Sequence, residues 1–223
     1  MLSEAQFGTS NRIKVTWGGH SMQRLSLFLV LVWALLFVQP QAWAARVGER
    51  APDFTAVDSN GNTHKLPDYA GKFVVLEWHN RGCPYTHKHY LGNMQQLQRE
   101  WIGRGVIWLT VISSAPGKQG YVTAEQENAY LKEVNASPTA VLLDPKGDLG
   151  HLYDAKTTPQ MFVINPNGIL VYDGAIDDRP TTDPADIPGA KNYLSQALTE
   201  AMAGKPVSIP TSTPYGCSVK YAH

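Results

Sequence analysis

Residues 72–86 read KFVVLEWHNRGCPYT. The first seven are apolar and β-branched enough to predict a buried strand, and Pro84 suits the first turn of a helix that begins directly afterwards. Cys83 is therefore expected where a strand ends and a helix starts. Free backbone N–H groups and the positive end of the helix dipole favour a thiolate there, and the thiolate is the form of cysteine that attacks disulfides and peroxides.

Strand and helix patterns alternate along the rest of the chain. A turn signal at residues 58–62 predicts a leading hairpin, and Asn165-Pro166-Asn167-Gly168 predicts a closing one. Further buried strands are expected at residues 106–112, 141–143, 161–164 and 169–172, and helices at residues 85–104, 123–134 and 191–203. This order predicts an α/β fold with a central mixed β-sheet flanked by helices.

The composition excludes several classes of protein. The chain of 223 residues has 19 basic and 19 acidic groups and no long basic run, so no nucleic-acid partner is expected. Two cysteines are too few for a disulfide-framework protein or a four-cysteine zinc site. They are enough for one disulfide or one reactive thiol, and nothing in the sequence implies an organic cofactor.

The N-terminal part of the sequence predicts export. Residues 25–38 read LSLFLVLVWALLFV, preceded by Arg24 and followed by Ala42-Trp43-Ala44, the layout of a secretory signal peptide cleaved after Ala44. The signal is expected at residues 22–44, with Met22 a more natural start than Met1. We expect a periplasmic or secreted protein that would meet the membrane only through an uncleaved signal. One domain at residues 45–204 and an irregular tail at 205–223, which carries Cys217, should follow.

The motifs after the signal resemble those of a known family. Ala51-Pro52-Asp53-Phe54, Cys83-Pro84, Thr158-Pro159 before a strand, and Asn165-Pro166-Asn167-Gly168 occur in that order. This combination, spread over residues 47–203, resembles the thioredoxin fold and, more narrowly, the peroxiredoxin-like group of the redoxin (AhpC/TSA) branch. The resemblance implies that Cys83 is the attacking thiol and that Pro159 is a cis-proline bordering the site with Thr158. The stretch 173–178, DGAIDD, also looks typical of that group.

The sequence departs from the family patterns at two places. Thr86 stands where thioredoxins carry the second cysteine of Cys-x-x-Cys, so that motif cannot exchange a dithiol internally. Leu76 and Asn80 stand where peroxiredoxins carry the proline and threonine of Pro-x-x-x-Thr-x-x-Cys. Asn80 remains a candidate for hydrogen bonding to a peroxide oxygen.

Cys217, within Pro214-Tyr215-Gly216-Cys217, is a candidate resolving thiol. Oxidation of Cys83 to a sulfenic acid, followed by condensation with Cys217, would give a disulfide that an external thiol reductant reopens. A peroxide and a protein disulfide are the two candidate oxidised substrates. A permanent structural disulfide and two unrelated thiols are the alternatives for this pair.

Other polar residues near Cys83 leave further alternatives open. Cys83 and His87 lie at i, i+4 on the predicted helix, so they could bind copper or zinc in a metal-delivery module. We expect instead that His79, His87 and His89 are solvated or loop residues beside a redox thiol. Glu77 is either a proton-relay carboxylate or a surface charge. A thiol-based oxidoreductase is the favoured interpretation, ahead of a metal-binding module and a non-catalytic scaffold.

Overall fold

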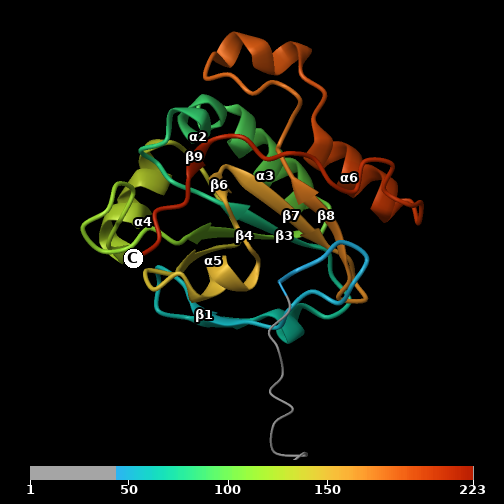
Figure 1. The fold of residues 1–223 in the computed structure, drawn as a ribbon, viewed down its shortest axis with the longest axis horizontal. Helices are drawn as coiled ribbons and strands as arrows, with labels where there is room; N and C mark the ends of the chain where they lie inside the picture. Colours follow the sequence, from blue (N-terminus) through green and yellow to red (C-terminus); the bar gives the residue numbers. More distant parts are fainter. Residues whose placement is uncertain (1–43, 223) are drawn as a thin grey trace, which may run out of the picture. The chain divides into compact units, whose positions relative to one another are not determined.

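The computed structural model describes residues 44–222 and contains a five-stranded mixed sheet of order β5-β4-β3-β7-β8 (Figure 1). β4 runs parallel to β3 and β5 parallel to β4, whereas β7 is antiparallel to β3, and β8 to β7. The strands are β3 (Val74–Trp78), β4 (Ile107–Ile112), β5 (Ala140–Leu143), β7 (Gln160–Ile164) and β8 (Leu170–Gly174). The predicted α/β fold with a mixed central sheet is confirmed.

Two apolar layers cover the sheet, one on each face. Successive side chains of a strand point to opposite faces, and Leu76 accordingly belongs to a core cluster different from that of Val75. The cluster of Leu76 includes residues of β1 (Thr55–Val57), η1 (Leu66–Tyr69) and α5 (Asp148–Leu152). β1 forms the N-terminal hairpin with β2 (Thr63–Lys65). The cluster of Val75 includes Tyr90, which directly follows α2 (Pro84–His89), and residues of α3 (Asn93–Gly103) and α6 (Tyr193–Met202). Burial from both sides explains why all five positions of β3 are inaccessible.

The predicted helix at residues 85–104 is two helices, α2 and α3. The chain breaks after α2, and Gly92 has φ +129°, a conformation that side-chain-bearing residues rarely adopt. The prediction was wrong because the apolar spacing continues through Leu91, whose side chain is exposed. The helix predicted at 123–134 is α4 (Ala124–Glu133), which begins with a capping box between Thr123 and Gln126.

The tail is more ordered than its proline content predicts. Cys217–Ser218 forms β9, which pairs antiparallel with β6 (Thr157–Thr158). η2 (Pro184–Gly189) precedes α6, and the tail then crosses from α6 past α2 to end near α4 (Figure 1). The expectation of an irregular tail was therefore wrong around Cys217.

The predicted signal peptide lies outside the described residues, apart from Ala44. Among residues 44–222, none of the helices has the length and apolar character needed to cross a membrane.

Candidate functional site

Cys83 ends the loop that follows β3 and caps the N-terminus of α2. Its backbone N–H donates to the Asn80 carbonyl at 2.9 Å, and its Sγ lies 3.1 Å from the carbonyl oxygen of Thr158. The side chain has 0% exposure, so the thiol is enclosed within the protein. The junction of strand and helix predicted for Cys83 is present.

Asn80 shapes the loop before Cys83. Its Oδ1 accepts a hydrogen bond from Gly82 N–H at 2.9 Å, and its Nδ2 donates to Gln119 Oε1 at 2.9 Å. Gln119 in turn donates to the Gly82 carbonyl at 2.6 Å. Because both ends of the amide are engaged, Asn80 holds the loop in place, and its predicted contact with a peroxide stays a prediction.

Thr158 and Pro159 border the thiol from the opposite side. The peptide bond between them is cis, as the resemblance implies, and both residues are buried. Gln160 steadies this segment, since its Oε1 accepts from Lys156 N–H at 2.8 Å and its Nε2 donates to Asp173 at 2.8 Å.

Cys217 lies directly beside Cys83. In the pairing of β9 with β6, Cys217 is opposite Thr158, and its backbone N–H points at Cys83 Sγ across 3.4 Å. Both cysteines are free thiols. The structure thus brings together four of the predicted site residues, Cys83, Thr158, Pro159 and Cys217.

The two thiols have opposite pKa shifts. Burial alone would raise the pKa of Cys83, but hydrogen bonds from the Cys217 side chain and from the backbone N–H groups of Thr86 and Cys217 outweigh it, so the pKa is lowered. Burial, together with the nearby Cys83, raises the pKa of Cys217 to about 11. Cys83 is therefore the better thiolate of the pair, and Cys217 stays protonated near neutral pH.

Glu77 is a buried carboxylate and not a surface charge. It accepts hydrogen bonds from Tyr90 Oη and Trp108 Nε1, both at 2.8 Å, and from Thr110 Oγ1 at 3.1 Å. Burial would raise the pKa of Glu77, but His79, 3.7 Å away, and the hydrogen bonds from Trp108 and Tyr90 outweigh it, so the pKa is lowered. The sequence could not distinguish this position from the surface, because a carboxylate is buried only where donors converge on it.

Two of the three histidines near Cys83, His79 and His89, differ from the expectation of solvated loop residues. His79 is buried between Glu77 and Glu127, whose oxygens lie 3.7 and 3.8 Å from its ring nitrogens. His89 is buried as well, whereas His87 is exposed. Within residues 44–222 no group of three or more His, Cys, Asp or Glu side chains is arranged to hold a metal ion. The metal alternative based on Cys83 and His87 therefore has no third ligand there.

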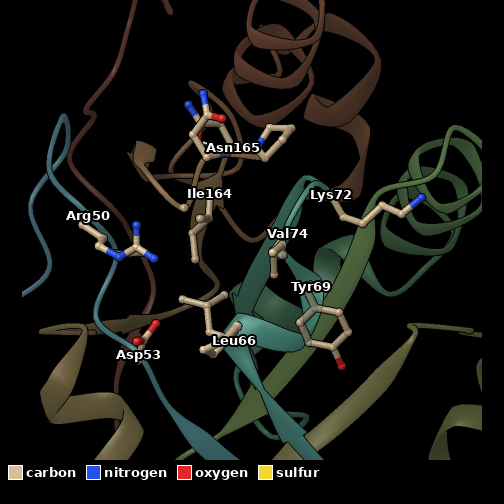
Figure 2. Close-up of a pocket in the computed structure, with 14 residues that line it drawn as sticks. Arg50, Asp53, Leu66, Tyr69, Lys72, Val74, Ile164 and Asn165 are labelled. Atoms are coloured by element: carbon tan, nitrogen blue, oxygen red, sulfur yellow. Dashed lines mark hydrogen bonds between the residues drawn. The ribbon is translucent and has the colours of Figure 1, made fainter.

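A separate hollow lies away from the thiols. It is lined by Arg50, Asp53, Tyr69, Lys72 and Val74, among others (Figure 2). Val74 begins β3, whereas Cys83 follows the end of that strand. The hollow is therefore at the other end of β3 and is not part of the thiol site.

Sequence reasoning missed several residues that hold the tail, namely Lys88, His89, Asp177, Tyr215 and Gly216. The one local signal was Gly216 directly before Cys217, since a glycine often marks a close approach of two backbone segments. A Cβ built on Gly216 would lie 2.7 Å from the Thr158 carbonyl carbon and closer still to its oxygen.

Comparisons with known proteins agree with this fold. Residues 47–173 match the profile of the AhpC/TSA family. A curated relative is the thiol-disulfide oxidoreductase ResA of Geobacillus kaustophilus, 26% identical over 66% of this chain and 82% of the relative. A hypothetical protein from Sinorhizobium meliloti superposes with a TM-score of 0.68 at 22% identity, covering 81% of this chain and 97% of that one. A Chlorobium tepidum structure classed as thiol:disulfide interchange protein DsbE has a TM-score of 0.53 at 26% identity, covering 71% and 99%.

Proposed function

Because the chain belongs to the AhpC/TSA family, we propose that it is a thiol oxidoreductase in which Cys83 and Cys217 cycle between a dithiol and a disulfide. The observation that carries this proposal is the position of Cys217, whose N–H lies 3.4 Å from Cys83 Sγ. The opposite pKa shifts assign the roles, with Cys83 attacking and Cys217 resolving. The substrate we favour is a disulfide, in keeping with relatives named thiol-disulfide oxidoreductase and thiol:disulfide interchange protein.

Reduction of a disulfide proceeds in two exchanges. The Cys83 thiolate bonds to one sulfur of the substrate, and the other sulfur leaves as a thiolate that takes a proton. Cys217 then loses its proton and attacks Cys83 Sγ, which releases the second substrate thiol and leaves the Cys83–Cys217 disulfide. An external dithiol reductant supplies two electrons and two protons to restore both thiols.

A peroxide is the second candidate substrate, and the enclosure of Cys83 favours it. With 0% exposure, the thiol is within reach of only a small oxidant unless the tail moves. The thiolate would take the terminal oxygen and become a sulfenic acid, while the other oxygen leaves as an alcohol or water after protonation. Condensation with the Cys217 thiol would expel water and give the same disulfide.

The site of action that fits this chemistry is outside the cytoplasm. The signal-peptide pattern of residues 22–44 supports export, and an oxidising compartment allows the disulfide to persist between cycles. The protein would then depend on an exported or membrane-bound thiol reductant.

The test uses the reduced protein, the Cys217→Ser variant and the Cys83→Ser variant. Each is exposed briefly to one equivalent of oxidised glutathione or of hydrogen peroxide, the remaining thiols are alkylated, and the intact chain is weighed. We expect both thiols of the wild type to be lost together, Cys217→Ser to stop at a glutathione adduct or an oxidised Cys83, and Cys83→Ser to remain unreacted. Unreacted thiols in the wild type, or an oxidised pair that dithiothreitol does not reopen, would contradict the proposal.

A further inference from the structure

The tail, residues 205–222, is attached to the domain on both sides of Cys217. Before it, Asp173 N–H donates to the carbonyl of Pro210 at 3.1 Å. After it, Val219 N–H donates to the carbonyl of Lys156 at 2.9 Å. The tail therefore crosses Cys83 as a strap that is held at two ends, with Cys217 in the middle.

Tyr215 makes the side-chain attachment nearest to Cys217. Its hydroxyl donates to the Asp177 carboxylate and lies 3.3 Å from His89 Nε2. Its ring packs edge-on against Tyr85 with centroids 5.9 Å apart, and Lys88 Nζ lies 5.8 Å from the ring centre. Three of these partners come from α2, the helix that Cys83 caps.

Asp177 and Lys88 connect this attachment to a second segment. Asp177 Oδ1 also accepts the backbone N–H of Arg179 at 2.9 Å, and the carbonyl of Arg179 accepts from Lys88 Nζ at 2.9 Å. Lys88, His89 and Asp177 are each at most 2% exposed. The Tyr215 hydroxyl therefore enters a preformed buried polar site, which accounts for part of the DGAIDD stretch at residues 173–178.

The strap closes the approach to Cys83. Gly216 lies so close to the Thr158 carbonyl that a Cβ would overlap it, and the next residue places its N–H on Cys83 Sγ. With Cys83 at 0% exposure, a sulfur carried on a bulky group cannot reach Sγ while the tail is in place.

We propose that Tyr215 is a specificity-determining residue that keeps the tail closed, a role we call the catch: through Asp177 and His89 it holds Cys217 over Cys83. A small oxidant then reacts with Cys83 while the tail is closed, whereas a bulky disulfide reacts only when the tail lifts. The inference rests on the proposed function, because it assigns the substrate selectivity of the same thiol pair. In the open state the chemistry is ordinary exchange. The Cys83 sulfur bonds to one sulfur of the disulfide, and the other leaves as a thiolate.

The test removes only the hydroxyl, by Tyr215→Phe, in a reduced Cys217→Ser background in which Cys83 is the one remaining thiol. Second-order rate constants are measured with hydrogen peroxide and with the aromatic disulfide dithiobis(nitrobenzoate). A hydrogen bond to a charged group is worth enough to shift an opening equilibrium about tenfold or more. We therefore expect the disulfide to react about tenfold faster in Tyr215→Phe, and peroxide less than about twofold faster.

The matched control is Tyr153→Phe, which loses a hydrogen bond of 2.8 Å to the carbonyl of Pro52, a residue outside the tail. It should leave the ratio of the two rate constants unchanged. Where the oxidants react with Cys83, three results would each overturn the catch: an equal rise of both rate constants in Tyr215→Phe, no rise of the rate constant for the disulfide, or the same change of their ratio in Tyr153→Phe.

A separate readout keeps this inference distinct from the proposed function. Alkylation of Cys83 by N-ethylmaleimide needs no electron transfer, yet it needs access to the thiol. If neither oxidant reacts with any variant, the proposed function fails, but alkylation about tenfold faster in Tyr215→Phe still supports the catch. Unchanged alkylation overturns it.

Discussion

Replacing Gly216 by alanine should separate Cys217 from Cys83 without damaging the core. Gly216 has φ +146°, and the added Cβ would lie 2.7 Å from the Thr158 carbonyl carbon. Backbone cannot yield as a flexible side chain does, so the clash should cost about 1–3 kcal/mol. The tail can relieve it by lifting, which loses the β6–β9 pairing and the contact of Cys217 N–H with Cys83 Sγ.

That cost sets the size of the effect on the disulfide. A free energy of 1–3 kcal/mol corresponds to a loss of roughly 5- to 150-fold in the effective concentration of Cys217 at Cys83. The assay equilibrates the protein with glutathione redox buffers and quantifies the Cys83–Cys217 disulfide by alkylation and intact mass. The Gly216→Ala protein should need a correspondingly more oxidising buffer.

Gly204→Ala is the matched control for this experiment. Gly204 also lies in the C-terminal part of the chain and has φ +71°, but no atom lies within 4 Å of a Cβ built there. It places an alanine at a positive φ, that of the left-handed helical region, without any overlap. The same disulfide stability in Gly216→Ala and Gly204→Ala would refute the argument that close packing on Thr158 positions Cys217.

Three further predictions concern the titrating groups. The pKa of Cys83 should rise in Cys217→Ala, because the thiol hydrogen bond from Cys217 is lost; ultraviolet absorbance of the thiolate measures it, and an unchanged pKa would contradict the assigned hydrogen bond. Burial lowers the pKa of His89 to about 4 from its usual 6.5. As the pH falls, His89 therefore becomes protonated in the unfolded chain before it does so in the folded protein. Urea unfolding should therefore show stability falling by up to about 3 kcal/mol as the pH drops through this interval, and a flatter profile in His89→Gln. Glu77→Gln should lower the free energy of unfolding by about 1–3 kcal/mol at pH 7, since donors to the carboxylate lose an acceptor. Because the pKa of Glu77 is lowered in the fold, its contribution is lost as the pH falls through that pKa, so the difference between wild type and variant should shrink in acid.

The sequence alone predicts the strands of the sheet and the part of the candidate site formed by Cys83, Thr158 and Pro159. Local patterns predict the buried strands, and Cys83-Pro84 and Thr158-Pro159 carry signatures confined to a few neighbouring residues. Apolar spacing predicts one helix over residues 85–104, but the chain breaks between α2 and α3, where Gly92 has a positive φ. A single glycine is a weaker signal than an apolar spacing that continues across it.

The tail could not be predicted for a physical reason. Cys217 is 134 positions from Cys83, and no local pattern specifies which strand edge a two-residue strand will pair with. The partners of Tyr215 are likewise separated in the sequence, with three on α2 and the fourth at Asp177, and only the folded chain brings them together. The sequence does not predict the burial of His79, His89 and Glu77 for a related reason. Their burial depends on hydrogen-bond donors and acceptors that distant segments supply.

The second thiol is on the tail and not on the helix, and this position changes what determines the reduction potential of the thiol pair. In a Cys-x-x-Cys motif the helix itself fixes the distance between the sulfurs, whereas here that distance depends on how tightly the tail is bound. Each tenfold change in tail binding should shift the reduction potential of the Cys83–Cys217 pair by about 30 mV. The contacts of Tyr215 and Gly216 that would stabilise the proposed disulfide are also those that hold the tail over Cys83. A substitution that opens the site to larger disulfides should therefore make the protein a stronger oxidant and a weaker reductant at the same time.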